Sequence, residues 1–162
     1  MKRRWSQLLF FAVLVLVFGL VVGGPLSDVS RYGETGVNST DSVTVTFVGS
    51  DGVELGQITG PIADTWTERR TGLSDTESLD PNEGMVFVYE DEGTRAFVMR
   101  NMSFPLDIIF VGEDGQITAI YHAAADADRH FSAQARWVIE VNQGYTDTHN
   151  VSVGDEVQGL PR

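Results

Sequence analysis

The stretch MRNMSFPLDIIF, residues 99–110, places a cation and an amide before a Phe-Pro pair, a carboxylate and aliphatic residues. Proline has no amide hydrogen and forces its predecessor into extended backbone, so this proline predicts the end of one strand and a new start. The run Leu106–Val111 then predicts a buried strand that contains Asp107. A buried ionised carboxylate is costly without a partner. We therefore expect a guanidinium, from Arg70 or Arg100, to pair with Asp107.

Short apolar segments alternate with turn residues along most of the chain, which is typical of antiparallel strands. The predicted strands cover residues 43–48, 54–59, 85–89, 95–99, 106–111, 116–121 and 137–141, and the segment 154–157 closes the domain. An acidic turn is expected at Glu90–Thr94. Short helices are expected at 64–72, with Asp64 or Thr65 as cap, and at 143–149. This spacing predicts a mainly β fold, a compact antiparallel barrel or sandwich.

The composition bounds both the size and the partners of the protein. A chain of 162 residues forms one ordinary domain, and the lack of cysteine excludes thiol nucleophiles, thiolate metal sites and disulfides. Beyond the basic N-terminus, eight arginines and no lysine stand against 23 acidic residues. Such a surface is typical of proteins from salt-loving archaea, where a Debye length of about 3 Å or less removes like-charge repulsion. Because a nucleic acid needs a basic patch, we expect no nucleic-acid partner.

The N-terminus begins Met-Lys-Arg-Arg-Trp and continues as the apolar run Leu8–Val22. This order predicts an export signal or signal anchor in residues 1–24. We expect this segment to form a hydrophobic helix through which the protein binds the membrane. The positive-inside rule places the domain outside the cell. No Ala-x-Ala site follows, so a retained anchor is favoured over a cleaved signal that would release the domain. Residues 25–41 predict a flexible linker with a candidate N-glycan acceptor at Asn38.

Familiar catalytic and metal-binding motifs are absent from the sequence. It contains no Gly-x-Ser-x-Gly elbow, phosphate loop or His-Glu-x-x-His pair. His122, His130 and His149 lack the spacing of metal ligands and are interpreted as structural or surface residues. The sequence therefore predicts no metal and no cofactor.

The polar residues around the Phe-Pro pair leave three interpretations open. In the first, Asn101, Asp107 and an arginine form a structural polar knot that braces the connection at the proline. In the second, Arg100, Asn101, Asp107 and Glu140 surround a cleft at a strand end and bind a small polar ligand such as a sugar or a carboxylate. In the third, Asp107 and Glu140 are the acid/base pair of a glycan hydrolase.

A series of sequence blocks carries a family resemblance. In chain order these blocks are Arg70–Leu73, Asn82–Phe87, Phe97–Phe110, Trp137–Val141 with Gly144, and Val153–Asp155. Together, over residues 43–160, they resemble the DUF192 (UPF0127) family. The resemblance implies a compact, mostly β domain at residues 42–162, often exported or membrane-tethered, with no established activity.

The leading functional prediction is a membrane-anchored domain outside the cell that binds a small ligand or an envelope component. A glycan hydrolase and a structural or assembly factor of the envelope are the alternatives. A binding face would be supported by an aromatic cluster of Trp66, Phe104, Tyr121 and Trp137 around a concave surface.

Overall fold

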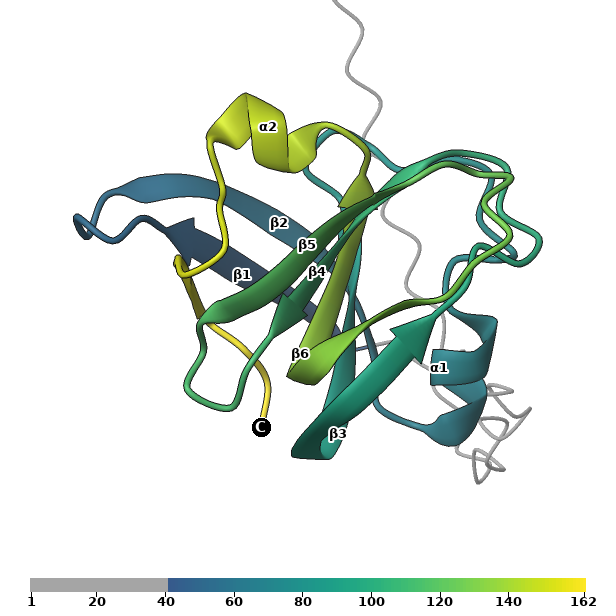
Figure 1. Cartoon of the computed structure of the whole chain (residues 1–162), viewed down its shortest axis with the longest axis horizontal. Coiled ribbons are helices and arrows are strands. Elements are labelled where there is room, and N and C mark those ends of the chain that lie inside the picture. The colour runs from purple at the N-terminus through teal and green to yellow at the C-terminus, as the bar shows by residue number, and fades with distance from the viewer. Residues whose placement is uncertain (1–40) are drawn as a thin grey trace, which may run out of the picture. The chain divides into compact units, whose positions relative to one another are not determined.

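The computed structural model describes residues 41–162, so the predicted signal or anchor, nearly all of the linker and Asn38 lie outside the described residues. The described part contains seven strands and two short helices (Figure 1). In chain order they are β1 (Ser42–Val48), β2 (Glu54–Ala63), α1 (Trp66–Thr71), β3 (Gly84–Phe97), β4 (Leu106–Val111), β5 (Ile117–Ala123), β6 (Phe131–Asn142), α2 (Tyr145–His149) and β7 (Glu156–Gln158). The mainly β fold class is confirmed.

The strands form one sheet in the order β5-β4-β6-β3-β2-β1-β7. Every neighbouring pair is antiparallel except β2 and β3, which run parallel with Ile62 opposite Val86. The prediction of a purely antiparallel sheet is therefore wrong at this pair. The connection 64–83, which contains α1, is long enough for the crossover that parallel strands require. The backbones of β2 and β3 approach each other so closely that a Cβ on Gly60 would overlap the carbonyl of Gly84.

The two outer strands of the sheet approach each other at one point. The amide of Ile117 donates to the carbonyl of Asp155 at 2.9 Å, and the amide of Val157 donates to the carbonyl of Gly115 at 2.8 Å. A single bridge between Gln116 and Glu156 lies between these bonds. The sheet is therefore barrel-like, and these bonds satisfy backbone groups that an open edge would expose.

Strand β4 is buried on both faces, as all six of its residues show. Its side chains alternate between two apolar clusters, which we call the first and second cores. The first core contains Val45, Phe47, Ile58, Ile109, Val111, Trp137, Ile139, Val141 and Tyr145. The second core contains Leu73, Phe87, Phe97, Leu106, Ile108, Phe110, Phe131 and Val138. The predicted strand 106–111 is confirmed residue for residue, because a long apolar run between two turns suits a doubly buried strand.

Strand β3 is continuous, so the predicted turn at Glu90–Thr94 is wrong. Val88 pairs with Trp137 and Gly93 pairs with Ala135, which leaves residues 89–92 opposite the single residue Arg136. This is a bulge within one strand, since both of its halves pair with β6 in the same direction. Gly93 is not among the glycines with positive φ, the conformation that a tight hairpin turn requires.

The chain leaves β3 at Phe97, two residues earlier than predicted, and crosses to β4 through residues 98–105. Asn101 occupies a turn in this connection with a φ of 59°. Met99 is buried, whereas Asn101 is exposed. The expected extension of the strand through Met99 is therefore wrong, because the chain turns before the proline.

Both predicted helices are present. Helix α1 begins after Thr65, whose hydroxyl accepts from the Glu68 amide while the Glu68 carboxylate accepts from the Thr65 amide. It ends at Gly72, with a φ of 51°. Among residues 41–162, neither helix has the length and apolar character needed to cross a bilayer.

Candidate functional site

Asp107 is fully buried in β4, and the start of α2 compensates its carboxylate. Oδ2 accepts from the Gly144 amide at 3.1 Å, from the Thr146 amide at 3.0 Å and from the Thr146 hydroxyl at 2.7 Å. Oδ1 lies 2.7 Å from Nδ1 of His122 on β5. Three segments of the chain therefore satisfy one carboxylate, as a buried charge requires.

The predicted guanidinium partner of Asp107 is wrong. Among residues 41–162, neither Arg70 nor Arg100 makes a hydrogen bond or an ion pair with this carboxylate. Both arginines line a cavity that is bounded by second-core residues. Asp107 points to the other face of β4, where His122 and the start of α2 take the expected role. The predicted polar knot of Asn101, Asp107 and an arginine is therefore not formed within the described residues; Asp107 has its polar contacts with His122, Gly144 and Thr146 instead.

Sequence reasoning missed His122, and the sequence carries no simple signal for it. Counting outward from the turn at Gly112–Gly115 does not place residue 107 opposite residue 122, because the pairing depends on a register shift between Phe110 and Val111. Thr146 had no signal either, since its approach depends on how α2 packs against the sheet.

Asp107 and Glu140 do not share a site. In the ladder between β4 and β6, Asp107 pairs with Val141 and Ile108 pairs with Glu140. Because neighbouring residues of a strand point to opposite faces, the two carboxyl groups lie on opposite faces of the sheet. The predicted cleft that contains both is therefore wrong, and so is their use as an acid/base pair.

Glu140 opens into a cavity of about 190 Å³ on the second-core face. The residue is 6% exposed, and its side chain makes no hydrogen bond to any of residues 41–162. Phe87 and Phe97 form an apolar wall, with ring centroids 4.8 Å apart in an edge-to-face arrangement. The remaining lining is largely Leu73, Met102, Tyr89, Arg69, Arg70 and Arg100.

Burial raises the pKa of Glu140 to about 8. At neutral pH the carboxyl group is therefore mainly protonated and presents one O–H donor and one carbonyl acceptor. A carboxyl with a raised pKa that faces a cavity and lacks a protein partner marks a candidate binding site.

The other sequence-predicted residues do not converge on this cavity. Asn101 is exposed in its turn and is not part of the lining. The four rings expected to cluster are dispersed: Trp137 is buried in the first core, Phe104 and Tyr121 pack against the second, and Trp66 is 70% exposed. No group of three His, Asp or Glu side chains in the described part of the chain is arranged to hold a metal ion.

A family model and two solved structures match this chain. The model of DUF192, a family described as an uncharacterized ACR, matches residues 47–159. The chain belongs to the DUF192 family. Comparison with curated proteins gave no match.

Two solved structures resemble this DUF192 chain. A protein from Sinorhizobium meliloti, provisionally described as a transcription regulator, superposes with a TM-score of 0.72 at 26% identity, covering 76% of this chain and 98% of the other. A protein of unknown function from Novosphingobium aromaticivorans superposes with a TM-score of 0.67 at 31% identity, covering 75% and 88% respectively. The β domain is therefore shared by both, and neither description names a ligand.

The contact between His122 and Asp107 makes the stability of this DUF192 domain depend on pH. The hydrogen bond to Asp107 raises the pKa of His122 above its usual value, against a smaller opposing effect of burial. A raised histidine pKa adds stability that is present below about pH 6.5 and is lost as pH rises through the folded-state pKa. We expect His122→Asn to lose more unfolding free energy at pH 5.5 than at pH 8.5, measured by urea unfolding. His130→Asn, at an exposed histidine, is the control, and an equal loss at both pH values for His122→Asn would contradict the assignment.

For Glu140 we expect the opposite effect on stability: replacing its ionisable carboxyl group stabilises the protein. Between pH 4.5 and about 8 the unfolded carboxyl ionises while the folded one stays protonated, so the wild type loses stability as pH rises. The loss is on the order of 5 kcal/mol at most. We expect Glu140→Gln to match the wild type near pH 4.5 and to exceed it at pH 8 in denaturant unfolding. The exposed Glu77→Gln is the control, and parallel curves for Glu140→Gln and wild type would refute the raised pKa.

Proposed function

We propose that this DUF192 domain is a binding module that its N-terminal apolar segment holds outside the cell membrane, and that the Glu140 cavity takes a small polar ligand. The observation that carries the proposal is the Glu140 carboxyl group, nearly fully buried yet without a hydrogen-bond partner among the described residues. A buried polar group without a partner costs about 1–3 kcal/mol. A ligand that hydrogen-bonds to Glu140 recovers this cost on binding.

The chemistry of the cavity favours a sugar or a carboxylate. A protonated carboxyl group can donate one hydrogen bond and accept another, which suits a hydroxyl or a carboxylate oxygen. The aromatic wall of Phe87 and Phe97 suits the apolar face of a small molecule. At about 190 Å³ the cavity is below the usual range for drug-sized ligands, so the ligand is small or is the end of a larger envelope component.

The arginines around the cavity favour a ligand with negative charge at its outer end. Arg70 and Arg100 are exposed, and Arg70 lies 5.4 Å from the centroid of the exposed Trp66 ring. Guanidinium groups recognise carboxylates with two parallel hydrogen bonds. The acid-rich composition suits a surrounding of molar salt, in which such local contacts persist while long-range repulsion is screened.

The ligand proposal is tested by a thermal-shift screen of monosaccharides, amino acids and simple carboxylates in high salt. We expect a binding compound to raise the wild-type Tm by several degrees at about 100 times its Kd. Glu140→Met, which keeps the volume and removes the hydrogen-bonding atoms, should lose the shift. Glu140→Gln mimics the protonated acid and should keep it, even at pH 9, where the wild type weakens. No shift with any compound, or an equal shift in Glu140→Met, would refute this site.

The membrane proposal is tested on the N-terminus of the protein made in cells. We expect the full chain of 17.8 kDa, with its basic start retained, in the membrane fraction by intact-mass spectrometry. Leu16→Arg, which places a charge inside the apolar run, should move protein to the soluble fraction, because a central arginine costs about 2.5–3.5 kcal/mol on insertion. If the wild-type protein is found in the soluble fraction with the mass of a chain that begins after residue 24, the signal is cleaved instead.

A further inference from the structure

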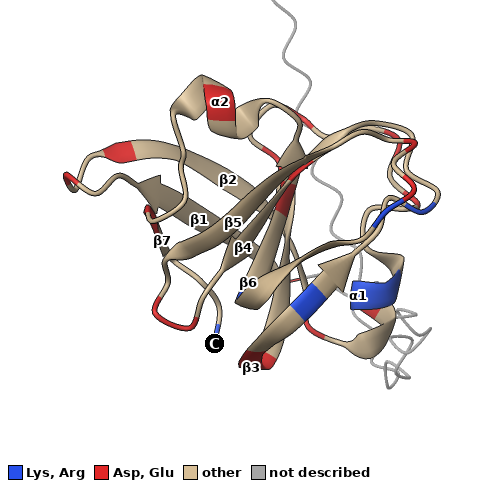
Figure 2. Cartoon of the chain, viewed as in Figure 1, with Lys and Arg blue, Asp and Glu red and all other residues tan. Residues whose placement is uncertain are grey.

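Arginines gather at a second hollow, beside the bulge of β3. Of the eight arginines beyond the basic N-terminus, Arg69, Arg95, Arg136 and Arg162 line one hollow of about 730 Å³, which we call the arginine hollow. They come from α1, β3, β6 and the segment after β7. The blue segments of α1 and β3 lie on the same side of the molecule in Figure 2. Four of the eight arginines therefore gather at one place, which is unexpected in a chain so rich in acidic residues.

Two of these guanidinium groups are held by uncharged partners. The Arg95 guanidinium lies 4.0 Å from the centroid of the Tyr89 ring, and that of Arg69 lies 4.9 Å from the same centroid. Arg69 also donates to the carbonyl of Val88 at 2.9 Å, and Nε of Arg95 donates to the carbonyl of Ala135 at 3.2 Å. These contacts fix the positions of the cations and leave their charge in place.

Only one guanidinium group of the arginine hollow forms an ion pair with a described residue. Within residues 41–162, neither Arg69 nor Arg95 forms an ion pair. Arg136 does so at 3.3 Å with Glu113, whose side chain is 65% exposed, and such surface pairs contribute about 0–1 kcal/mol. The Nε atom of Arg136 is buried and has no hydrogen-bond partner in the same part of the chain.

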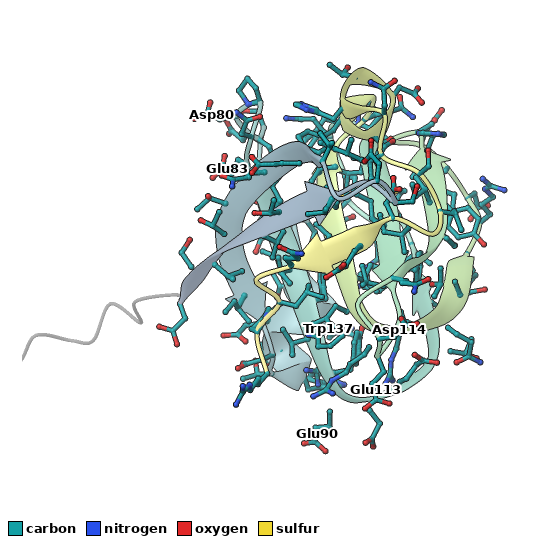
Figure 3. The ribbon with its side chains drawn as sticks, turned by 90° about the vertical axis from the view of Figure 1, so that its left-hand side faces the viewer. Asp80, Glu83, Glu90, Glu113, Asp114 and Trp137 are labelled. Carbon is teal, nitrogen blue, oxygen red and sulfur yellow. The ribbon has the colours of Figure 1, made fainter. Side chains whose placement is uncertain are left out.

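The acidic residues near the arginine hollow do not fill it. Asp64, Glu90 and Asp91 contribute to the lining, but all three are exposed and none is in an ion pair within the described part. Figure 3 shows Glu90 projecting away from the molecule at its lower end. Their repulsion of an anion falls in salt, whereas contacts with fixed guanidinium groups are screened less.

We propose that the arginine hollow binds the phosphoryl group of a small organic phosphate. The guanidinium groups of Arg69, Arg95 and Arg136, from three different elements, provide more donors than the two oxygens of a carboxylate can accept, and suit the three free oxygens of a phosphate ester. The volume of about 730 Å³ leaves room for the organic part. The acid-rich composition of the chain argues against a nucleic acid as the source of the phosphoryl group.

Tyr89 adds a neutral donor to the arginine hollow. Its hydroxyl makes no hydrogen bond to the described residues, and burial raises the pKa of the phenol, although Arg69 and Arg95 partly oppose this. The hydroxyl therefore keeps its proton and can donate to a phosphate oxygen. Tyr89 and Arg69 also line the Glu140 cavity, but Arg95 and Arg136 line only the hollow. The inference does not rest on the proposed ligand of Glu140.

The test is calorimetric titration of the full-length chain in a non-ionic detergent at fixed ionic strength. The probes are inorganic phosphate, glycerol 3-phosphate and acetate. We expect saturable binding of both phosphates and at least tenfold weaker binding of acetate. Arg95→Gln and Arg136→Gln should each weaken phosphate binding at least tenfold. Arg129→Gln should leave it unchanged, because Arg129 stacks on Phe131 at 4.4 Å and is not part of the hollow.

A second variant separates loss of binding from loss of folding. Arg95→Lys keeps the positive charge but lacks the guanidinium fork, so we expect an intermediate loss of phosphate binding while a cooperative unfolding transition is retained in the absence of phosphate. Absence of saturable heat with either phosphate, equal binding of acetate, or an equal loss in Arg129→Gln would overturn the proposal. Glu140→Gln should bind phosphate normally, which distinguishes failure of this site from failure of the Glu140 cavity.

The source of the phosphoryl group is identified in the same calorimeter. Dihexanoyl phosphatidic acid, a soluble lipid analogue, carries the same phosphate monoester as glycerol 3-phosphate. Tighter binding of the lipid analogue, lost in Arg95→Gln, supports the proposal and assigns the group to a lipid headgroup. Equal affinity for the two compounds supports it and assigns the group to a free metabolite.

Discussion

The compensation of the buried Asp107 carboxylate is the constraint on which the arrangement of β4, β5 and α2 depends. An ionised carboxylate with no exposed surface is tolerated only when hydrogen bonds replace its hydration. His122 supplies one contact from the neighbouring strand, and Gly144 and Thr146 supply three from the start of α2. Because these donors come from segments far apart in the sequence, satisfying one side chain also positions α2 at the end of the sheet.

The same sheet carries a second buried carboxyl group with a different environment. Glu140 lies one ladder step from Asp107 but points to the opposite face, where it meets a cavity instead of amide donors. Asp107 is therefore interpreted as structural, and Glu140 as the centre of the proposed binding site. The difference comes from strand alternation and from the partners on each face, since both residues are acidic and almost fully buried.

Local signals in the sequence were sufficient for several elements. Strand β4 and the start of α1 depend on residues close together in the chain. The buried strand was predicted, and Thr65 was one of the two residues predicted as the helix cap, although the reciprocal bond from Glu68 was not. The continuous path of β3 could not be predicted, because the acidic run at Glu90 resembles a hairpin tip and only its pairing with β6 shows otherwise. The separation of Asp107 from Glu140 depends on the register between β4 and β6, strands that are distant in sequence. The arginine hollow likewise assembles from four separate segments.

The bulge of β3 has a consequence for how relatives of this protein can diverge. Residues 89–92 are outside the ladder, while the strand pairs with β6 on both sides of them. Residues could therefore be added or removed there without shifting the register of either flank or disturbing the two cores. The shape and charge of the adjoining hollow can thus change during evolution while the framework of the fold stays the same.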